Sequence, residues 1–152
     1  MHPFFSRDSL SAYYNKFYLA SRNQTEGQHL PSDSKPIDRQ FKLSQNRLAL
    51  INHFAPYFSS VIDFGAGDCA AYYLIQKISL ADTIHVVDPS ETAQRLSAQY
   101  GICYSEDLGN APAVDFIYSA HSIEHVHGLL AVMDGLVFRL NYDGCIFIET
   151  PA

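Results

Sequence analysis

The feature that most constrains this chain is a regular alternation, after residue 60, of short apolar runs with segments long enough to form helices. Strands that are apolar on both faces and alternate with helices are typical of a parallel sheet covered on both sides. We therefore expect an α/β fold, a doubly wound sheet of about five parallel strands. The expected strands are Ser60–Phe64, Ile84–Asp88, Ile102–Tyr104, Val114–Ser119 and Cys145–Glu149, and the expected helices are Asp68–Leu80, Glu91–Tyr100 and Ile123–Leu140.

The part of the chain before this alternation differs in composition. Residues 1–38 are predicted to form an aromatic helical extension with a polar linker, and residues 39–152 the core domain. A helix is expected over about Asp38–Tyr57. The tyrosines of the extension either pack in the core, as aromatic clusters usually do, or form a lid over a ligand. They are Tyr13, Tyr14 and Tyr18.

Composition argues against several classes of protein. The 152 residues suffice for one domain, and a formal net charge of −6 gives no broad field to attract nucleic acid. No apolar run approaches the roughly 20 residues of a membrane span, and the first residues lack the pattern of a signal peptide, so we expect a cytoplasmic protein. The cysteines are widely spaced, which favours reduced thiols over a zinc site or disulfides. They are Cys69, Cys103 and Cys145.

A glycine turn follows the first expected strand, in the sequence Asp63-Phe64-Gly65-Ala66-Gly67-Asp68-Cys69. Glycines permit positive φ and let a ligand approach the backbone, and the next helix offers unpaired N–H groups. Dinucleotide enzymes place GxGxxG here to hold a pyrophosphate, but this chain lacks the third glycine. The carboxylates of Asp63 and Asp68 would repel a pyrophosphate and favour a ligand that carries an ammonium or a sulfonium.

The run from Asp63 to Gly67 resembles the D-x-G-x-G first motif of class I S-adenosylmethionine (SAM) dependent methyltransferases, which have a Rossmann-like sheet. In that family the glycine turn packs against the methionine part of SAM, so the resemblance implies SAM as cofactor and Asp63, Gly65 and Gly67 as cofactor-binding residues. Cys69 stands where the family often has a third glycine. A generic strand–turn–helix corner is the alternative interpretation.

Acidic residues follow the second and third expected strands. Asp88 ends the second strand about 25 residues after Asp63. Carboxylates at this place bind the ribose hydroxyls of nucleotides, although Asp88 could instead cap the next helix. After the third strand, the resemblance implies that Glu106 or Asp107 contacts the adenine amino group. Exposed acidic loops are common, so an ordinary surface role stays open for both.

The segment that begins Val114-Asp115-Phe116 resembles the family's fourth motif, a strand followed by an "EHV" helix start. Ligands of doubly wound sheets bind beyond the carboxyl ends of the strands, at the topological switch point. The resemblance therefore implies that backbone atoms of three residues lie over the cofactor. These are Ser119, Ala120 and His121.

Glu124 and His125 are the predicted catalytic residues. An imidazole accepts a proton near neutral pH and a carboxylate can orient it. In some sugar C-methyltransferases of this family, such a pair helps to remove a substrate proton. The alternative is a structural pair, with Glu124 at the helix dipole and His125 packed. A metal site at His121, His125 and His127 is rejected, because no matching carboxylates or thiols accompany them.

The resemblance covers about Arg39 to Ala152 and implies methyl transfer to a small-molecule or sugar/glycan-precursor acceptor. Family domains normally continue through two further strands, which this sequence does not contain, so we expect a chain truncated after its fifth strand. An exposed fifth strand would favour a homodimer or a further C-terminal region. Two other hypotheses stay open: a methyltransferase-like domain that binds SAM or a protein partner without catalysis, and a nicotinamide-dependent oxidoreductase, which the glycine pattern disfavours.

Overall fold

The computed structural model describes residues 58–69 and 81–151, together with Arg47, Ala49, Ile51, His53, Ala71 and Ile75. Within them, a five-stranded parallel sheet has the order β3-β2-β1-β4-β5. The expected five-stranded parallel α/β architecture is thereby confirmed. The strands are β1 (Phe58–Phe64), β2 (Ala81–Val87), β3 (Cys103–Ser105), β4 (Val114–Ala120) and β5 (Leu140–Glu149), and the helices are α5 (Glu91–Tyr100), α6 (Leu129–Phe138) and the short 3-10 helices η2 (Leu108–Asn110) and η3 (Ile123–His125).

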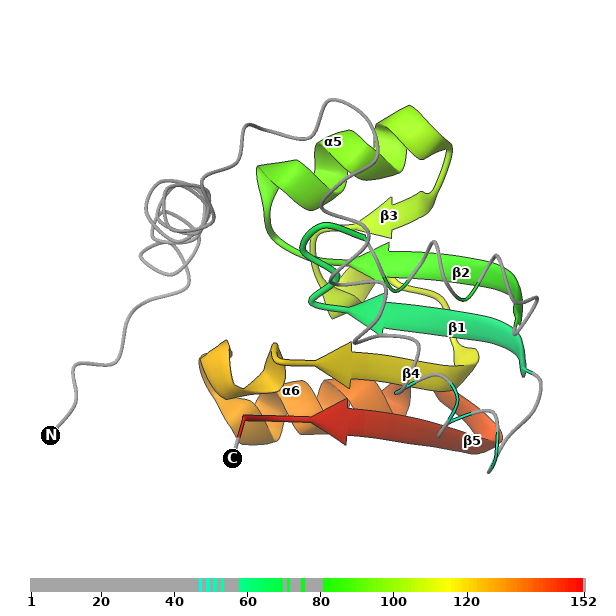
Figure 1. Ribbon diagram of the computed structural model, residues 1–152. Coiled ribbons are helices and arrows are strands. Elements are labelled where there is room, and N and C mark those ends of the chain that lie inside the picture. Colours follow the sequence, from blue (N-terminus) through cyan, green and yellow to red (C-terminus); the bar gives the residue numbers. More distant parts are fainter. Residues whose placement is uncertain are drawn as a thin grey trace, which may run out of the picture.

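The strand order puts β1 at the centre of the sheet. The chain proceeds outward from β1 to β3 and then returns to place β4 on the other side of β1. All carboxyl ends point to one edge, as the arrowheads in Figure 1 show. The direction of winding reverses between β1 and β4, so the topological switch point lies at the ends of these two strands.

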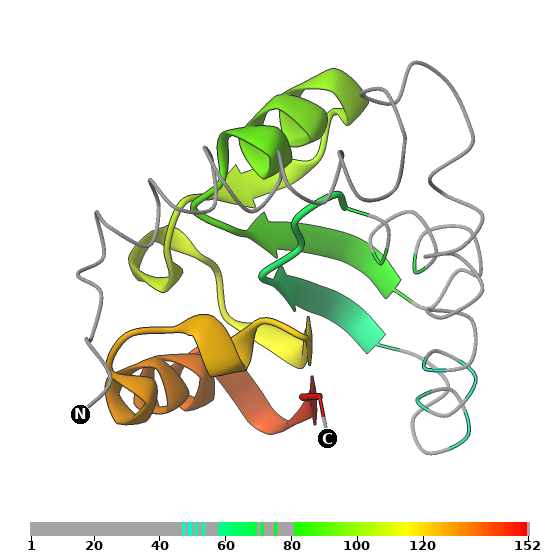
Figure 2. The same cartoon turned by 60° about the vertical axis from the view of Figure 1, so that its left-hand side comes forward.

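Helices α5 and α6 cover opposite faces of the sheet. In the β1–β2 register Ile62 pairs with His85 and Asp63 with Val86, so Ile62 and Val86 point to different faces. Leu136 of α6 packs in the cluster that contains Ile62, whereas Leu96 of α5 packs in the cluster that contains Val86. Figure 2 shows the two helices on either side of the strands. The sheet is therefore doubly wound.

Helix α5 has the predicted bounds because both of its ends carry strong signals. The Ser90 side chain accepts a hydrogen bond from the amide of Ala93, at 3.2 Å, and caps the first turn. Gly101 follows the helix with φ of 66°, and its amide donates to the Ser97 carbonyl. Local capping residues therefore mark both ends of this helix.

The helix predicted over Ile123–Leu140 is wrong as a single element. The structure has the 3-10 turn η3 first and then α6, separated at Gly128. Gly128 has φ of 69°, a left-handed conformation that interrupts a right-handed helix. Consequently Glu124 and His125 lie on a one-turn element and not at the start of a long helix.

Strand β5 begins at Leu140 and not at Cys145 as predicted. Val114 pairs with Leu140 and Phe116 with Cys145, so β5 carries a bulge before Cys145. Asp143 lies in that bulge with φ of 64°. All ten residues of β5 are exposed or half-buried, which corrects the expectation of a strand covered on both faces, and in the described sheet β5 is an edge.

Several predictions concern residues that the structure describes only in part. Ala71 and Ile75 are helical, as are Arg47, Ala49, Ile51 and His53, which agrees with the two helices predicted there at these positions alone. The extension, its tyrosines and the boundary near residue 38 lie outside the described residues. No described helix has both the length and the apolar character that a membrane span requires.

Candidate functional site

The glycine turn after β1 is built from left-handed backbone at alternate positions. The φ angles are 73° at Gly65, 53° at Gly67 and 59° at Cys69. The Gly65 amide donates to the Val87 carbonyl at 2.8 Å, which ties the turn to β2. A Cβ at Gly65 would overlap the Ser122 side chain, whereas a Cβ at Gly67 would meet nothing within 4 Å. Gly65 is therefore required by packing, and Gly67 borders open space.

Cys69 adopts a conformation that usually requires glycine. A non-glycine residue with positive φ is strained, which explains physically why a third glycine suits this place. The side chain is buried, with 4% of the residue exposed. Burial, and next the negative charge of Asp63, raises the pKa of the Cys69 thiol to about 12. The thiol is consequently neutral near pH 7 and behaves as a packing group.

Asp63 belongs to the interior of the turn, since only 2% of the residue is exposed. Its charge lies near Tyr118 on the adjacent strand β4. Desolvation, and then this charge, raises the pKa of Tyr118 above its ordinary value. Asp63 is thus a buried carboxyl group beneath the turn, with almost no accessible surface.

Asp88 connects the turn with the start of α5. Its Oδ2 accepts a hydrogen bond from the Gly67 amide at 2.8 Å, and its Oδ1 accepts one from the Ser90 amide at 2.7 Å. The Tyr104 hydroxyl donates to the Asp88 carbonyl at 2.8 Å. Because Ser90 is the N-cap, the alternative that Asp88 caps α5 is wrong. Each carboxylate oxygen keeps a further lone pair that could accept a ligand hydroxyl.

The two acidic candidates after β3 have different surroundings. Asp107 precedes η2 as its N-cap and accepts a hydrogen bond from the Gly109 amide at 2.9 Å. Glu106 is exposed, and its charge contributes to the raised pKa of Tyr104, after burial and Asp88. Tyr104 in turn lies against Asp88. Glu106 is thus the candidate that lies at the surface beside the Asp88 region.

The three residues predicted to contact the cofactor at the end of β4 differ in their exposure. Ser119 is fully buried, so it has no accessible surface in this structure. Ala120 is half-buried, and His121 is exposed with φ of 53°. The Ser122 hydroxyl lies 3.0 Å from the Gly65 carbonyl oxygen and 3.1 Å from the Ala120 carbonyl oxygen, and it can donate its single hydrogen to either of them. This hydroxyl joins the ends of β1 and β4 at the topological switch point.

A network of ionisable side chains extends from the end of β5. Arg47 forms a two-pronged contact with Glu149, at 2.7 Å from Nε and 2.6 Å from Nη2. The Glu149 Oε1 also lies 3.0 Å from His121 Nε2. Glu124 Oε1 lies 3.9 Å from His121 Nδ1 and 3.6 Å from His125 Nε2. The predicted pair Glu124 and His125 therefore belongs to a larger network.

The network shifts the ionisation of its strongest pair. The hydrogen bond with Arg47 lowers the pKa of Glu149, with a smaller contribution from His121. The same hydrogen bond raises the pKa of Arg47. Both shifts favour the charged forms, so Glu149 is an anion at neutral pH and can hold an imidazole by charge as well as by geometry.

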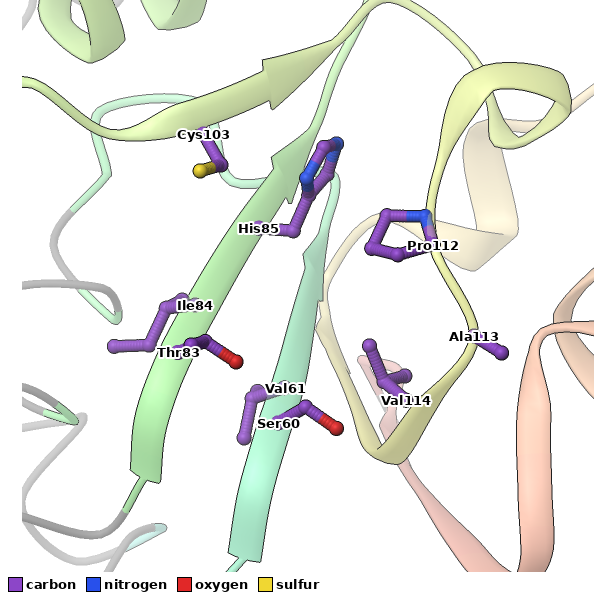
Figure 3. A pocket seen from close by; sticks show the side chains of 9 residues that line it. All are labelled: Ser60, Val61, Thr83, Ile84, His85, Cys103, Pro112, Ala113 and Val114. Atoms are coloured by element: carbon purple, nitrogen blue, oxygen red, sulfur yellow. The ribbon is translucent and has the colours of Figure 1, made fainter.

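A cavity of about 130 Å³ lies elsewhere, toward the amino-terminal half of the strands (Figure 3). The His85 ring borders it, and its Nε2 lies 2.7 Å from the Ser105 hydroxyl. Burial lowers the pKa of His85. Other lining residues are Ser60, Thr83, Cys103, Pro112 and Val114. No three His, Cys, Asp or Glu side chains among the described residues are arranged to hold a metal ion.

Four residues of the carboxyl edge escaped prediction from sequence. Ser122 lies between the predicted site residues His121 and Glu124 but was not itself predicted to belong to the site. Tyr104 was predicted only as part of a strand. Arg47 and Glu149 are 102 positions apart, and no local pattern indicates their contact. The acidic residue before Thr150-Pro151 was the available signal for Glu149, since it ends the last strand at the ligand edge.

Comparison with known proteins identifies the fold. No family model and no curated protein matches the sequence. Among solved structures, the plantazolicin methyltransferase BpumL in complex with a pentazolic desmethylPZN analogue and SAH matches with a TM-score of 0.66 at 16% identity over 92% of this chain. Magnesium protoporphyrin IX methyltransferase from Synechocystis PCC 6803 with bound SAM matches with 0.62 at 12% identity over 93%. Coclaurine N-methyltransferase matches with 0.55 at 20% identity over 78%.

The matches do not extend over the whole of those proteins. The chain spans 56% of the BpumL structure, 74% of the protoporphyrin methyltransferase and 38% of the coclaurine enzyme. These matches and the strand order lead to one conclusion: the chain has the fold of the class I SAM-dependent methyltransferases.

Proposed function

We propose that this chain binds SAM at the carboxyl ends of β1 and β2 and transfers its methyl group to a small-molecule or sugar/glycan-precursor acceptor. The observation that carries the proposal is the left-handed turn at Gly65 and Gly67, held by Asp88, with open space above Gly67. Similar structures contain SAH or SAM, which supports the same cofactor here. We also propose a cytoplasmic location.

The residues present fit this cofactor. Open space at Gly67 would admit a ligand against the backbone, and the buried charge of Asp63 would favour a cation such as a sulfonium. The remaining lone pairs of Asp88 would accept the ribose hydroxyls. Glu106, with Asp107 as the second candidate, would contact the adenine amino group. The backbone of Ala120 and His121, with Ser119 beneath it, would close the other side.

When bound, SAM supplies a methyl group activated by a sulfonium. The protein's own contribution is to hold the acceptor against that group and to exclude competing orientations, which accounts for much of the rate of such transfers. Glu124 and His125 are the proposed residues for local proton removal, because both are exposed and their side chains lie 3.6 Å apart. Proton transfer to a positioned imidazole is effective near neutral pH.

A non-catalytic domain that binds SAM or a protein partner is the second candidate. Exposed apolar side chains near β5 favour it, because large apolar patches on a surface often mark contacts with other chains. A second copy of this chain or a further C-terminal region would be the covering partner. The exposed residues include Leu130, Phe138 and Tyr142.

Calorimetric titration of the purified chain with SAM, SAH and NAD tests the proposal. We expect micromolar binding of SAM and SAH, weaker or no binding of NAD, and loss of binding in Asp88→Ala. Gly67→Ala places a methyl group in the open space and should also abolish binding. Gly101→Ala is its matched control, since Gly101 likewise has positive φ and open space but caps α5. Preferential binding of NAD would refute the assignment. An equal loss of SAM binding in Gly67→Ala and Gly101→Ala would refute it as well.

A further inference from the structure

The backbone of His121 is fixed by a hydrogen bond, although its side chain is exposed. Its amide donates to the Glu149 carbonyl at 2.8 Å, which continues the β4–β5 ladder past the end of β4. Its backbone is in the left-handed region, which is uncommon for residues other than glycine and often marks a functional position. The side chain is nevertheless 44% exposed. A strained backbone therefore presents an accessible imidazole at the topological switch point.

The surroundings of the ring determine which nitrogen can accept a proton. Glu149 lies 3.0 Å from Nε2, so of the two neutral tautomers this carboxylate favours the one that carries its hydrogen on Nε2. Nδ1 then has the free lone pair, and the nearest carboxylate oxygen to it, on Glu124, is 3.9 Å away. The other ionisable groups of this network are Arg47 behind Glu149, His125 beside Glu124 and Tyr118 on β4.

The position of His121 relative to the proposed cofactor also matters. The glycine turn and Asp88 occupy the β1–β2 part of the edge. An acceptor must therefore approach over β4 and β5, which is where the contact with Glu149 places the ring of His121. His125 lies on η3, beyond the strand end, and its Nε2 is 3.6 Å from Glu124.

We propose that His121, oriented by Glu149, takes the role that the proposed function gives to His125 and removes the proton of the acceptor, and that the acceptor carries a phenolic or enolic hydroxyl. This inference rests on the proposed methyl transfer. The O–H bond breaks, the proton forms an N–H bond at Nδ1, and the electron pair stays on the acceptor oxygen. The carboxylates of Glu149 and Glu124 balance the charge of the imidazolium. Glu149 is a positioning residue, and Arg47 holds it.

The choice of hydroxyl follows from the need for a base. A neutral amine has a free lone pair and needs no proton removal before it attacks. A thiol ionises appreciably near neutral pH without help. A phenol or enol with an ordinary pKa is mostly protonated at that pH, and it is a strong enough acid for an imidazole–carboxylate pair to remove its proton, whereas an aliphatic alcohol is a far weaker acid.

The first test uses nitrogen-15 NMR of the full chain, without any ligand. We expect His121 to carry its hydrogen on Nε2 in the wild type and to lose this preference in Glu149→Gln. His127→Gln, an exposed residue of the same segment, should leave the His121 signals unchanged. A wild-type His121 with its hydrogen on Nδ1 would overturn the proposal.

The second test measures methyl transfer from SAM to phenol and to 4-nitrophenol at pH 8. Phenol is mostly protonated there and 4-nitrophenol is mostly ionised, so only phenol needs a base. We expect His121→Gln to lower transfer to phenol about 100-fold and transfer to 4-nitrophenol far less. His127→Gln should match the wild type. Equal losses for both phenols, or a larger loss in His125→Gln, would overturn the proposal.

Binding of SAH separates this inference from the proposed function. We expect His121→Gln to bind SAH within about twofold of the wild type, because the inference gives its side chain no part in holding the cofactor. SAH binding without methylation of either phenol would overturn the hydroxyl assignment and leave the cofactor site intact. Absence of SAH binding in the wild type would refute the proposed function itself, whatever the NMR signals of His121 show.

Discussion

The two halves of the carboxyl edge are built in different ways. In the β1–β2 half, backbone amides and the carboxylate of Asp88 hold the turn, and Asp63 and Asp88 are 2% and 6% exposed. In the β4–β5 half, exposed or half-buried ionisable side chains form a network of close contacts. The network connects Arg47, Glu149, His121, Glu124 and His125. The first half is fixed by backbone geometry and the second by ionisation.

Under the proposed function, this difference assigns rigid recognition of the cofactor to the first half and adjustable chemistry to the second. Buried hydrogen bonds to backbone amides keep one geometry at every moderate pH, which suits an invariant cofactor. Exposed charged pairs contribute little to stability and respond to pH and to a bound molecule. We therefore expect substitutions in the first half to affect folding, and substitutions in the second half to affect stability little.

The largest effect is expected for Gly65→Ala. The new Cβ would overlap Ser122, and positive φ would add strain, so the free energy of unfolding should fall by about 3 kcal/mol or more. Urea unfolding followed by circular dichroism measures this change. Gly67→Ala, with similar φ and open space at its Cβ, should cost only about 1 kcal/mol. Equal costs for the two variants would contradict the close packing of the halves at Ser122.

Cys69 provides the next test, because it has a positive φ, which glycine adopts without strain. Cys69→Val adds a β-branched side chain at positive φ and should lower stability by about 2 kcal/mol. Cys69→Gly relieves strain but loses a buried side chain, so we expect a change within about 1 kcal/mol. Thermal unfolding of both variants checks the order. A valine variant as stable as the glycine variant would show that the turn is not strained at this residue.

Ser122→Ala removes the side-chain link between the two halves. Loss of the hydroxyl that serves the Gly65 and Ala120 carbonyls should lower stability by about 1 kcal/mol and weaken SAH binding. Thr83→Ala is the control, because Thr83 donates to the Ser59 carbonyl at 3.2 Å near the other end of β1. Urea unfolding and calorimetry should show that only the Ser122 variant loses affinity. Identical behaviour would mean that the link plays no part in the site.

The smallest effect is expected for Glu149→Gln in acid. The pKa of Glu149 is lowered in the folded protein, chiefly by Arg47, so its stabilising contribution is present above its usual pKa range and is lost as pH falls through the folded value. Because the pair is partly exposed, this contribution should be about 1 kcal/mol at most. Stability measured from pH 7 to pH 3 should therefore fall less in the variant. Parallel curves would show that the pair contributes nothing measurable.

Sequence was sufficient where the signal is local. The caps at Ser90 and Gly101 gave α5 its bounds, and apolar runs located all five strands. Errors arose where one residue type permits two outcomes. Asp143 and Gly144 predict a turn, yet pairing with β4 makes them part of a bulge. Gly128 was a sequence signal for a helix break that the prediction did not use.

In the site, too, the residues that could be predicted are those with a local sequence signal. The turn and Asp88 are close in sequence to recognisable strands, so their position at one edge was predictable, although their roles stay predictions. The contact of Arg47 with Glu149 depends on how a preceding helix packs across the sheet, which no spacing rule encodes. Likewise, only the three-dimensional structure shows that Glu124 lies between His121 and His125.

The bulge at Asp143 has a consequence for the behaviour of the chain at high concentration. An edge strand recruits other chains when it presents an uninterrupted row of amides and carbonyls. In β5 the ladder to β4 shifts register before Cys145 and is regular only from there to Glu149, so the exposed template is short and bent. We therefore expect the bulge to protect concentrated solutions of this protein from strand-to-strand aggregation.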